Sequence, residues 1–413
     1  MASEAEVGRV DGCECAARFA DRFLPAWLEV ALPPGTDSAP VVEELPDKGD
    51  PATTLAQART AFMLAHLGTL TGNARLTVAA RRVAGFVTRY LQDEDGGCRY
   101  AVNPDGSWIG TDEATLRRTY DQTFVLLALV TLRHADPTAV SQEQVNQCWS
   151  FVETVLTDRA NAALWEDDAM AARGPQPGDL RAQNPHMHML EAVLQCLELT
   201  GDAVWADRAR VLVAAGARFF VDPATGAVRE FVGHDLSPID TPPGDRREPG
   251  HQYEWAWLLL RYSELTGDSS PRSLVGPMTD FAATHGWVEQ GPMAGALHDA
   301  LRADGRVLEA SHLLWPLTEA GKYFAAIART TGDEGAAQKV RDIADLIFGR
   351  FFARDGKPAW VNQFDSNGNV IWDAGLSRLL YHVAIFVSEG AAAGLWPLTA
   401  PDDGSREGGA HTQ

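Results

Sequence analysis

The stretch MHMLEAVLQCLELTGDAVWADRARVLVAAGARFF, residues 187–220, holds an apolar helical pattern, a Gly-Asp turn and a second helical pattern. Gly201 can adopt the left-handed conformation that ends the first helix, and Asp202 can cap the second. The same turn returns at three other places: Leu70-Thr71-Gly72-Asn73, Leu265-Thr266-Gly267-Asp268 and Thr330-Thr331-Gly332-Asp333. Gly201 and Gly267 lie 66 positions apart, and Gly267 and Gly332 lie 65 apart. The chain therefore repeats a helical hairpin.

Counting these repeats predicts the architecture. Gly72 and Gly201 lie 129 positions apart, about two periods, and residues 134–137 supply the intervening turn. A sixth unit ends near residues 390–395. We therefore predict an all-α fold of six helical hairpins in a closed ring of about twelve helices. The expected helices are 16–30, 52–68, 74–91, 119–131, 141–156, 187–199, 203–220, 252–265, 271–285, 315–330, 335–352 and 379–393.

Between these pairs lie long segments rich in Gly, Asp and Trp. Two of them, 100–109 and 359–372, contain turn signals between strand-like runs and predict short β-hairpins on one rim of the ring. We expect one catalytic domain over residues 1–399. The polar, Gly-rich residues 400–413 are expected to form a disordered tail.

Composition excludes several classes of partner. The net charge of −21 disfavours nucleic acid and anionic membranes, and no apolar stretch reaches the length of a membrane span. Residues 1–12 are polar and acidic, unlike a signal peptide. The five cysteines are scattered, with no Cys-x-x-Cys pair. We therefore predict a cytoplasmic protein, monomeric or homodimeric.

Three histidines lie in unusual surroundings. The first motif is Asn184-Pro-His-Met-His-Met-Leu-Glu191, the second is Glu248-Pro-Gly-His-Gln-Tyr-Glu-Trp255, and the third is Tyr381-His382. All stand where a loop enters a helix, so the histidines are expected to meet at one mouth of the ring. His251 and Glu254 are three apart and share a helix face, which suggests an imidazole oriented by a carboxylate for acid–base chemistry.

A metal site is the competing interpretation. The spacing from His251 to Glu254 differs from His-Glu-x-x-His, and His186 and His188 are expected to point in different directions. We predict no metal and no other cofactor. A purely structural role, capping or packing, is the other alternative for each histidine.

The aromatic residues favour a carbohydrate ligand. The chain has 12 tryptophans, several of them in the inter-repeat segments or at helix entries. Arg59, Asn184, Trp315, Glu319 and Trp372 form the predicted substrate-binding set, because aromatic faces pack on sugar rings while polar groups bind hydroxyls. The sequence contains no P-loop and no nucleophile elbow. A glycosidase with paired carboxylates and a non-catalytic binding ring remain alternatives.

At these motifs the chain resembles the N-acylglucosamine 2-epimerase superfamily, from about Arg59 to Glu389. The strongest points are residues 184–192, 248–256, Leu314-Trp-Pro-Leu-Thr-Glu319 and 381–382. The resemblance implies an (α/α)6 barrel that acts on a free reducing sugar without metal or nucleotide. The form Glu-Pro-Gly-His-x-aromatic-Glu-Trp is most similar to the mannose isomerase branch.

The resemblance also implies a reaction. It assigns catalysis to His188, His251 and His382, with Glu254 paired to His251. His382 would remove the C2 proton of the open-chain sugar and return it to C1 through a cis-enediol. The expected activity interconverts D-mannose and D-fructose and, by the same chemistry, D-lyxose and D-xylulose. The alternative is a 2-epimerase of the N-acylglucosamine or cellobiose type, in which His251 reprotonates C2 from the opposite face.

Overall fold

A computed structural model describes residues 10–32, 34–35, 38–352 and 357–398. The predicted tail, 400–413, lies outside these ranges, as does the segment 1–9. The described residues are predominantly helical, as predicted. No helix among them is both long enough and apolar enough to cross a membrane.

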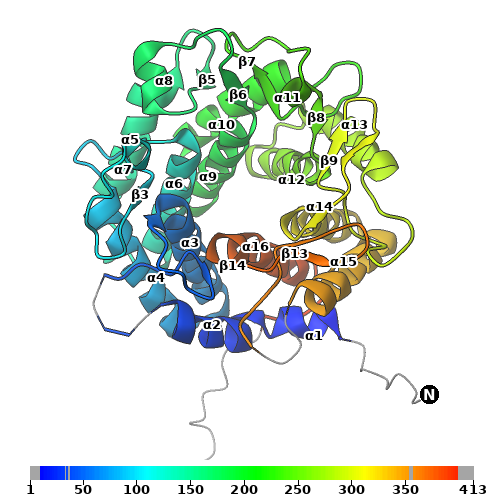
Figure 1. The fold of residues 1–413 in the computed structure, drawn as a ribbon, viewed down its shortest axis with the longest axis horizontal. Helices are drawn as coiled ribbons and strands as arrows, with labels where there is room; N and C mark the ends of the chain where they lie inside the picture. The colour runs from blue at the N-terminus through cyan, green and yellow to red at the C-terminus, as the bar shows by residue number, and fades with distance from the viewer. Residues whose placement is uncertain (1–9, 33, 36–37, 353–356, 399–413) are drawn as a thin grey trace, which may run out of the picture.

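Six helices surround the centre of the molecule (Figure 1). They are α3 (Thr54–Thr71), α6 (Thr119–Ala135), α9 (Asn184–Thr200), α12 (Pro249–Thr266), α14 (Trp315–Thr331) and α16 (Leu380–Ala392). Each contacts the next in this order, and α16 contacts α3. The contacts therefore run around a complete circle. All six inner helices begin at the same end of it.

A second layer of helices lies outside the first. It comprises α4 (Ala74–Phe86), α7 (Gln142–Phe151), α10 (Ala203–Ala215), α13 (Arg272–His285) and α15 (Glu334–Leu346). Four of these continue into π-helical turns: η2 (Val87–Leu91), η3 (Val152–Leu156), η4 (Gly216–Phe220) and η5 (Ile347–Phe351). The predicted helix 16–30 is divided into α1 (Gly12–Ala17), η1 (Phe19–Phe23) and α2 (Leu24–Ala31), and α1 packs on α15. Short helices α5 (Asp112–Thr115), α8 (Asp168–Arg173), α11 (Pro242–Asp245) and η6 (Ser377–Leu379) lie in the connecting segments.

The Gly turns have the predicted geometry. Gly72, Gly201, Gly267 and Gly332 end their helices at φ of 68°, 66°, 74° and 71°. At this φ a side chain would be strained, which explains the repeated glycine. Asn73, Asp202 and Asp333 then cap the following helices. The third turn differs, because α13 begins after Pro271 and Asp268 instead accepts a hydrogen bond from the Ser270 amide.

The strands are short, and four of their pairings follow one rule. The strand before an inner helix pairs with the strand after the outer helix of the same hairpin, giving β2–β3, β6–β7, β8–β9 and β11–β12. β1 follows α2 and pairs with β14, which precedes η6 and α16, so the first and last segments of the chain form the sixth unit. The strands are β1 (Glu44–Leu45), β2 (Ala52–Thr53), β3 (Ala101–Val102), β4 (Thr157–Asp158), β5 (Ala163–Leu164), β6 (Leu180–Ala182), β7 (Phe231–Gly233), β8 (Arg246–Arg247), β9 (Ala300–Arg302), β10 (Val307–Glu309), β11 (His312–Leu313), β12 (Gln363–Phe364), β13 (Val370–Trp372) and β14 (Gly375–Leu376).

The two predicted hairpins have different outcomes. Within 359–372, β12 pairs with β13 as predicted. Within 100–109 the prediction is wrong, because β3 pairs with β2 rather than with the residues after its own turn. The turn itself is present, since the Asn103 amide bonds the Ser107 carbonyl.

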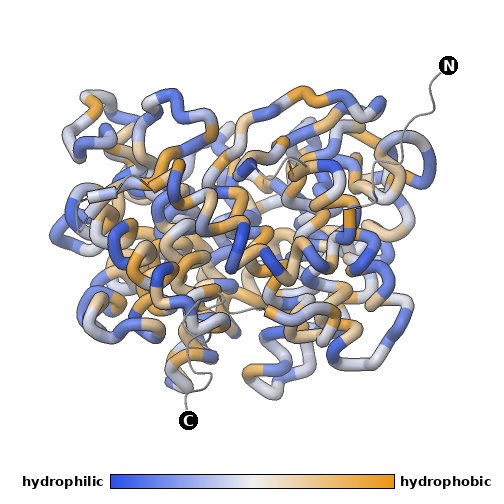
Figure 2. The backbone as a smooth tube through the Cα atoms, turned by 90° about the horizontal axis from the view of Figure 1, so that it is seen from below, coloured by the Kyte–Doolittle hydropathy of each residue, from blue (hydrophilic) through white to orange (hydrophobic). Residues whose placement is uncertain are grey.

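Apolar side chains fill the space between the two layers. Most of the buried ones form one contiguous cluster that runs from Ala16 to Trp396. Seen from the side, the ring is a thick disc with loops and turns at its two ends (Figure 2). All five cysteines are free thiols. At the two ends of the disc, polar residues can face inward, so a functional site is expected at one of these ends.

Candidate active site

The starts of the inner helices bring the predicted histidines to one end of the ring. His188 lies on α9, His251 on α12 and His382 on α16. Their exposed fractions are 2%, 6% and 5%. Trp315 opens α14 and lies between two of them, with its ring centre 4.7 Å from that of His251 and 6.0 Å from that of His382.

Each of the three imidazoles is held by a buried carboxylate at Nδ1. The distances are 3.0 Å from His188 to Glu191, 2.8 Å from His251 to Glu230 and 2.6 Å from His382 to Glu319. An Nδ1–H that donates to a carboxylate fixes the tautomer and leaves Nε2 for other chemistry. Within the described ranges, Nε2 of these rings has no hydrogen-bond partner. The site therefore contains three oriented His–carboxylate pairs.

The predicted pairing of His251 with Glu254 is wrong. His251 Nδ1 lies 2.8 Å from Glu230 and 3.3 Å from Glu248, because the ring turns toward the rim rather than along α12. Burial alone would lower the pKa of His251, but the charges of Glu230 and Glu248 outweigh it and raise the pKa to about 10. His251 is therefore an imidazolium at neutral pH.

Glu254 lies deeper, between two other charged groups. It is completely buried, and neither of its oxygens accepts a hydrogen bond from the described residues. One oxygen is 3.8 Å from His188 Nδ1 and 3.8 Å from Lys322 Nζ. Burial, reinforced by Glu319, raises its pKa well above the usual carboxylate range. Glu254 is therefore a buried carboxyl group at the base of the site, between His188 and Lys322.

The other two histidines have the opposite charge state from His251. Burial lowers the pKa of His188 to about 4, against the opposing effect of Glu191. Burial, Arg59 and Lys322 lower the pKa of His382 well below its ordinary value. Both rings are therefore neutral at pH 7. The site thus places two neutral imidazoles beside one imidazolium.

Arg59 supplies a second fixed positive charge. It is 4% exposed, and one guanidinium nitrogen donates to the Tyr120 hydroxyl at 2.7 Å. Its guanidinium carbon also lies 4.1 Å from the ring centre of Phe124 and 4.8 Å from that of Tyr381. No carboxylate among the described residues lies within ion-pair distance of Arg59. A buried cation surrounded by aromatic rings is positioned to receive an anion.

The remaining predicted residues divide into three cases. Glu319 is completely buried behind His382 and pairs with Lys322, so it supports the ring instead of facing a ligand. Asn184 lies one turn before His188 on α9, and its buried Oδ1 has no hydrogen-bond partner in the described ranges. Trp372 lies apart from the histidines on β13, where it lines a rim hollow of about 400 Å³ together with Tyr100 and Arg378.

His186, which we did not predict to be catalytic, has a structural role. The Leu164 amide donates to its Nε2 at 2.9 Å, and its Nδ1 lies 3.2 Å from the Ala182 carbonyl. Both ring nitrogens are thereby occupied, and burial lowers the pKa of the ring to about 3. The two histidines of the first motif do point to different partners, as predicted.

Sequence reasoning missed several residues of this site. Glu191 and Tyr381 stand within the quoted motifs, and the Tyr381 hydroxyl donates to Glu191. The i,i+3 rule, applied to His188, would have found Glu191. Glu230, in contrast, lies in the loop between η4 and β7, far from any motif. Arg378, one turn before His382, carries no pattern of its own.

A glycine in the second motif allows the aromatic packing. A Cβ on Gly250 would lie 2.6 Å from the Trp315 ring and 2.9 Å from Pro316 Cα. Gly250→Ala is therefore expected to displace Trp315 from between His251 and His382 and to raise KM about tenfold, with a smaller change in kcat. Steady-state kinetics of this variant test the expectation. Gly276→Ala is the control, because a Cβ there meets nothing within 4 Å.

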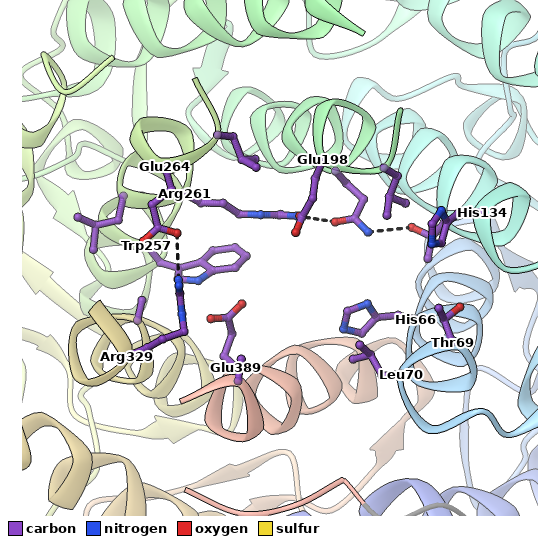
Figure 3. A pocket seen from close by; sticks show the side chains of 17 residues that line it. His66, Thr69, Leu70, His134, Glu198, Trp257, Arg261, Glu264, Arg329 and Glu389 are labelled. Atoms are coloured by element: carbon purple, nitrogen blue, oxygen red, sulfur yellow. Dashed lines mark hydrogen bonds and ion pairs between the residues drawn. The ribbon is translucent and has the colours of Figure 1, made fainter. Parts of the chain in front are cut away.

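The opposite end of the ring contains a different cavity, of about 420 Å³ (Figure 3). The ends of the inner helices line it, and Arg261 pairs with Glu198 while Arg329 pairs with Glu264. His66 and Glu389 also point into it. None of the three histidine–carboxylate pairs lines this cavity, so the two ends of the ring differ in chemistry.

Three groups of side chains at the histidine end have the composition of a cation site. They are His188 with Glu191 and Glu254, His251 with Glu230 and Glu248, and His382 with Glu254 and Glu319. In each group Nδ1 already bonds a carboxylate, so a cation would have to replace that proton. Removal of metal by a chelator is the direct test of the predicted independence.

Comparison with known proteins identifies the family. Residues 43–385 match the sequence model of the N-acylglucosamine 2-epimerase family. The chain is 27% identical over 390 residues to a mannose-6-phosphate isomerase of Rhizobium meliloti, covering 91% of this chain and 95% of that protein. It is 28% identical over 246 residues to a D-mannose isomerase of Thermobifida fusca, covering 54% and 57% of the two chains.

A crystal structure of a D-mannose isomerase has the same fold. The TM-score is 0.77 at 18% identity, with 93% of this chain and 99% of that one covered. At such an identity the likeness concerns the fold alone. The family match extends over most of the chain and includes His188, His251 and His382. The chain therefore belongs to the N-acylglucosamine 2-epimerase family.

Proposed function

We propose that this protein is an aldose–ketose isomerase that interconverts D-mannose and D-fructose at the histidine end of an (α/α)6 barrel. D-Lyxose and D-xylulose have the same configuration at the reacting carbons and are further substrates. Family membership and the isomerase relatives support an enzyme that acts on sugars. The choice of isomerisation rests on the unequal charge states of His382 and His251.

His382 is the proposed base. The C2 hydrogen of an aldose becomes acidic only in the open-chain form, where C1 is a carbonyl. The ring is neutral, and Glu319 holds Nδ1, so Nε2 can accept this proton. The resulting cis-enediol then receives the proton back at C1 from the same nitrogen. One base on one face is sufficient for this reaction.

His251 is proposed as a fixed acid for oxygen. An epimerase needs a second imidazole that gives a proton to C2 in one direction and removes it in the other. Two carboxylates at 2.8 and 3.3 Å hold the proton on His251 too firmly for that exchange. Its Nε2–H can instead donate to O1 or O2, assist ring opening and stabilise the enediolate together with Arg59.

The rim hollow that contains Trp372, apart from the histidines, carries more acidic than basic side chains, and this favours a free sugar over a sugar phosphate. The hollow that contains Trp372 is also lined by Glu43, Glu44, Asp50 and Glu113, against the single guanidinium of Arg378. A phosphate group there would meet like charges. We therefore propose D-mannose as the substrate, although one relative is named a mannose-6-phosphate isomerase.

The pH dependence of activity follows from these charge states. His382 has a lowered pKa, so its base form persists below pH 6.5, and activity is expected to hold across neutral pH. His251 must keep its proton, so activity is expected to fall as the pH rises through about 10. Glu230→Gln removes the nearer carboxylate and is expected to move this alkaline limb down by at least about one pH unit.

The measurement is kcat/KM against pH for both proteins. Glu248→Gln is the comparison variant, and a smaller shift is expected because Glu248 is 3.3 Å from His251 rather than 2.8 Å. If neither substitution moves the alkaline limb, that limb reports the titration of a group other than His251.

The function itself is tested by incubating the purified protein with D-mannose in D₂O and reading the products by NMR. The expected product is fructose without glucose, with some deuterium at C1 from solvent exchange. An EDTA-treated sample is expected to be equally active. Glucose as the product would establish the 2-epimerase alternative instead. Mannose 6-phosphate is tested in the same way. If the protein turns it over faster than D-mannose, the assignment to the free sugar is wrong.

A further inference from the structure

A lysine lies completely buried beneath the histidine site. Lys322 is on α14, one turn after Glu319, with which it forms an ion pair. Its Nζ is also 3.8 Å from Glu254 and 4.3 Å from the centre of the Trp257 ring. Lysine is almost never buried to this degree without such partners. None of the sequence motifs singled it out.

The surroundings keep Lys322 charged. Burial would lower its pKa, but Glu319, Glu254 and Glu191 together raise it above the ordinary value. Burial raises the pKa of Glu319 above its usual value, and Lys322 is the largest influence that opposes this rise. Without the ammonium group, Glu319 would be a buried carboxylate with only a neutral imidazole beside it, and it would bind a proton.

Solvent ions have no access to replace this charge. The exposed fraction of Lys322 is 0%, and Trp257 separates it from the cavity at the far end, where the indole forms part of the wall (Figure 3). Toward the histidine end, its ion-pair partner Glu319 contacts His382 Nδ1. The ammonium group is therefore the only cation among the described residues within 4 Å of Glu319.

We propose that Lys322 is a positioning residue for His382: it keeps Glu319 ionised, so that Glu319 accepts the Nδ1–H bond and leaves Nε2 free to act as the base. A protonated Glu319 could instead donate to Nδ1, which would place the ring proton on Nε2 and abolish the base. The inference rests on the proposed function, in which His382 is that base.

Activity provides the first test. Lys322→Met is expected to lower kcat about a hundredfold with KM changed less than about threefold, because the sugar contacts remain while the base is lost. The acid limb of the pH profile is expected to move to higher pH, since Lys322 repels the charge on His382. Lys339→Met is the matched control: Lys339 also lies over a tryptophan, 3.5 Å from the Trp287 ring centre, but on the outer helix α15. A variant with normal kcat and an unmoved acid limb would overturn the proposal.

A second test does not depend on turnover. ¹⁵N NMR of histidine-labelled protein reports which nitrogen of His382 carries the proton, with the signal assigned by its loss in His382→Asn. Wild type is expected to show the Nδ1–H tautomer, and Lys322→Met to show a shift toward Nε2–H. If this shift occurs but mannose is not isomerised, the positioning role stands and the proposed reaction fails. An unchanged tautomer contradicts the role of Lys322 whatever the activity.

If Lys322→Met does not fold, a measurement on the wild-type protein still tests the role of Lys322. ¹⁵N-lysine NMR is expected to show one ammonium group that stays protonated at alkaline pH, beyond the titration of the exposed lysines, with slow hydrogen exchange. Loss of that proton within or below the ordinary lysine range would mean that Lys322 cannot hold Glu319 ionised.

Discussion

His382→Asn is expected to lower kcat by about 10²–10⁴-fold, the range that a general base contributes, while sugar binding is retained. The reason is local. His382 is neutral because burial, Arg59 and Lys322 lower its pKa, and Glu319 fixes its Nδ1 at 2.6 Å. Asparagine keeps a donor toward Glu319 but has no group that can accept a proton from carbon. Steady-state kinetics with D-mannose measure the loss.

The matched control is His66→Asn. His66 also has a lowered pKa, about 4, and one nitrogen bound to Ser388 at 3.0 Å, but it faces the cavity at the far end. This variant is expected to retain wild-type kcat. Exchange of the mannose C2 hydrogen with D₂O should likewise disappear in His382→Asn and persist in His66→Asn. Full exchange in His382→Asn would assign the base to another residue.

Arg59→Met is expected to lower kcat by about 10²–10³-fold without reducing stability. The loss of activity follows from the loss of a preorganised charge beside the developing enediolate. Stability is expected to change by less than about 1 kcal/mol, because the cation–π contacts that are lost offset the desolvation cost that is relieved. Kinetics and denaturant unfolding of the same variant measure the two effects.

Arg181→Met provides the contrast. Arg181 is equally buried, but it donates to the Leu164 carbonyl at 2.6 Å and lies 3.5 Å from Asp158, away from the histidines. Its removal leaves Asp158 buried without its charged partner and is expected to cost about 3–5 kcal/mol of unfolding free energy. Arg59→Met is thus expected to lower activity without lowering stability, and Arg181→Met is expected to lower stability. Equal destabilisation by both substitutions would indicate that Arg59 has a structural role.

The repeat made most of the fold predictable. Gly201, Gly267 and Gly332 mark the ends of inner helices, and a helix that ends at a left-handed glycine can be located without knowledge of its neighbours. The strand pairing was not predictable in the same way. The residues around Val102 look like half of a hairpin, but their hydrogen bonds go to Ala52, in a segment about 50 residues earlier. Local patterns cannot report such a partner.

The same distinction applies to the site. His188, His251 and His382 were predictable as a group because each stands at the start of an inner helix, and a ring brings equivalent positions together. Their partners were predictable only when they lay on the same helix or in a quoted motif, as Glu191 and Glu319 do. Glu230 comes from a loop of an adjacent hairpin, and only folding brings it within 2.8 Å of His251. The pairing of His251 with Glu254 was wrong because it was predicted from helix spacing, whereas the partner of His251 is set by a tertiary contact.

The common direction of the inner helices has an electrical consequence. Each helix has a macrodipole equivalent to about half a positive charge at its start and half a negative charge at its end. Six parallel helices therefore polarise the ring along its axis, with the positive pole around the histidines. This field favours an anion at that end, so the enediolate of the proposed reaction would be stabilised as it forms. At the negative pole, the guanidinium groups of Arg261 and Arg329 lie near the helix ends, where cations are favoured. The ring of inner helices thus supplies a directional field that would assist the proposed reaction at one end and oppose it at the other.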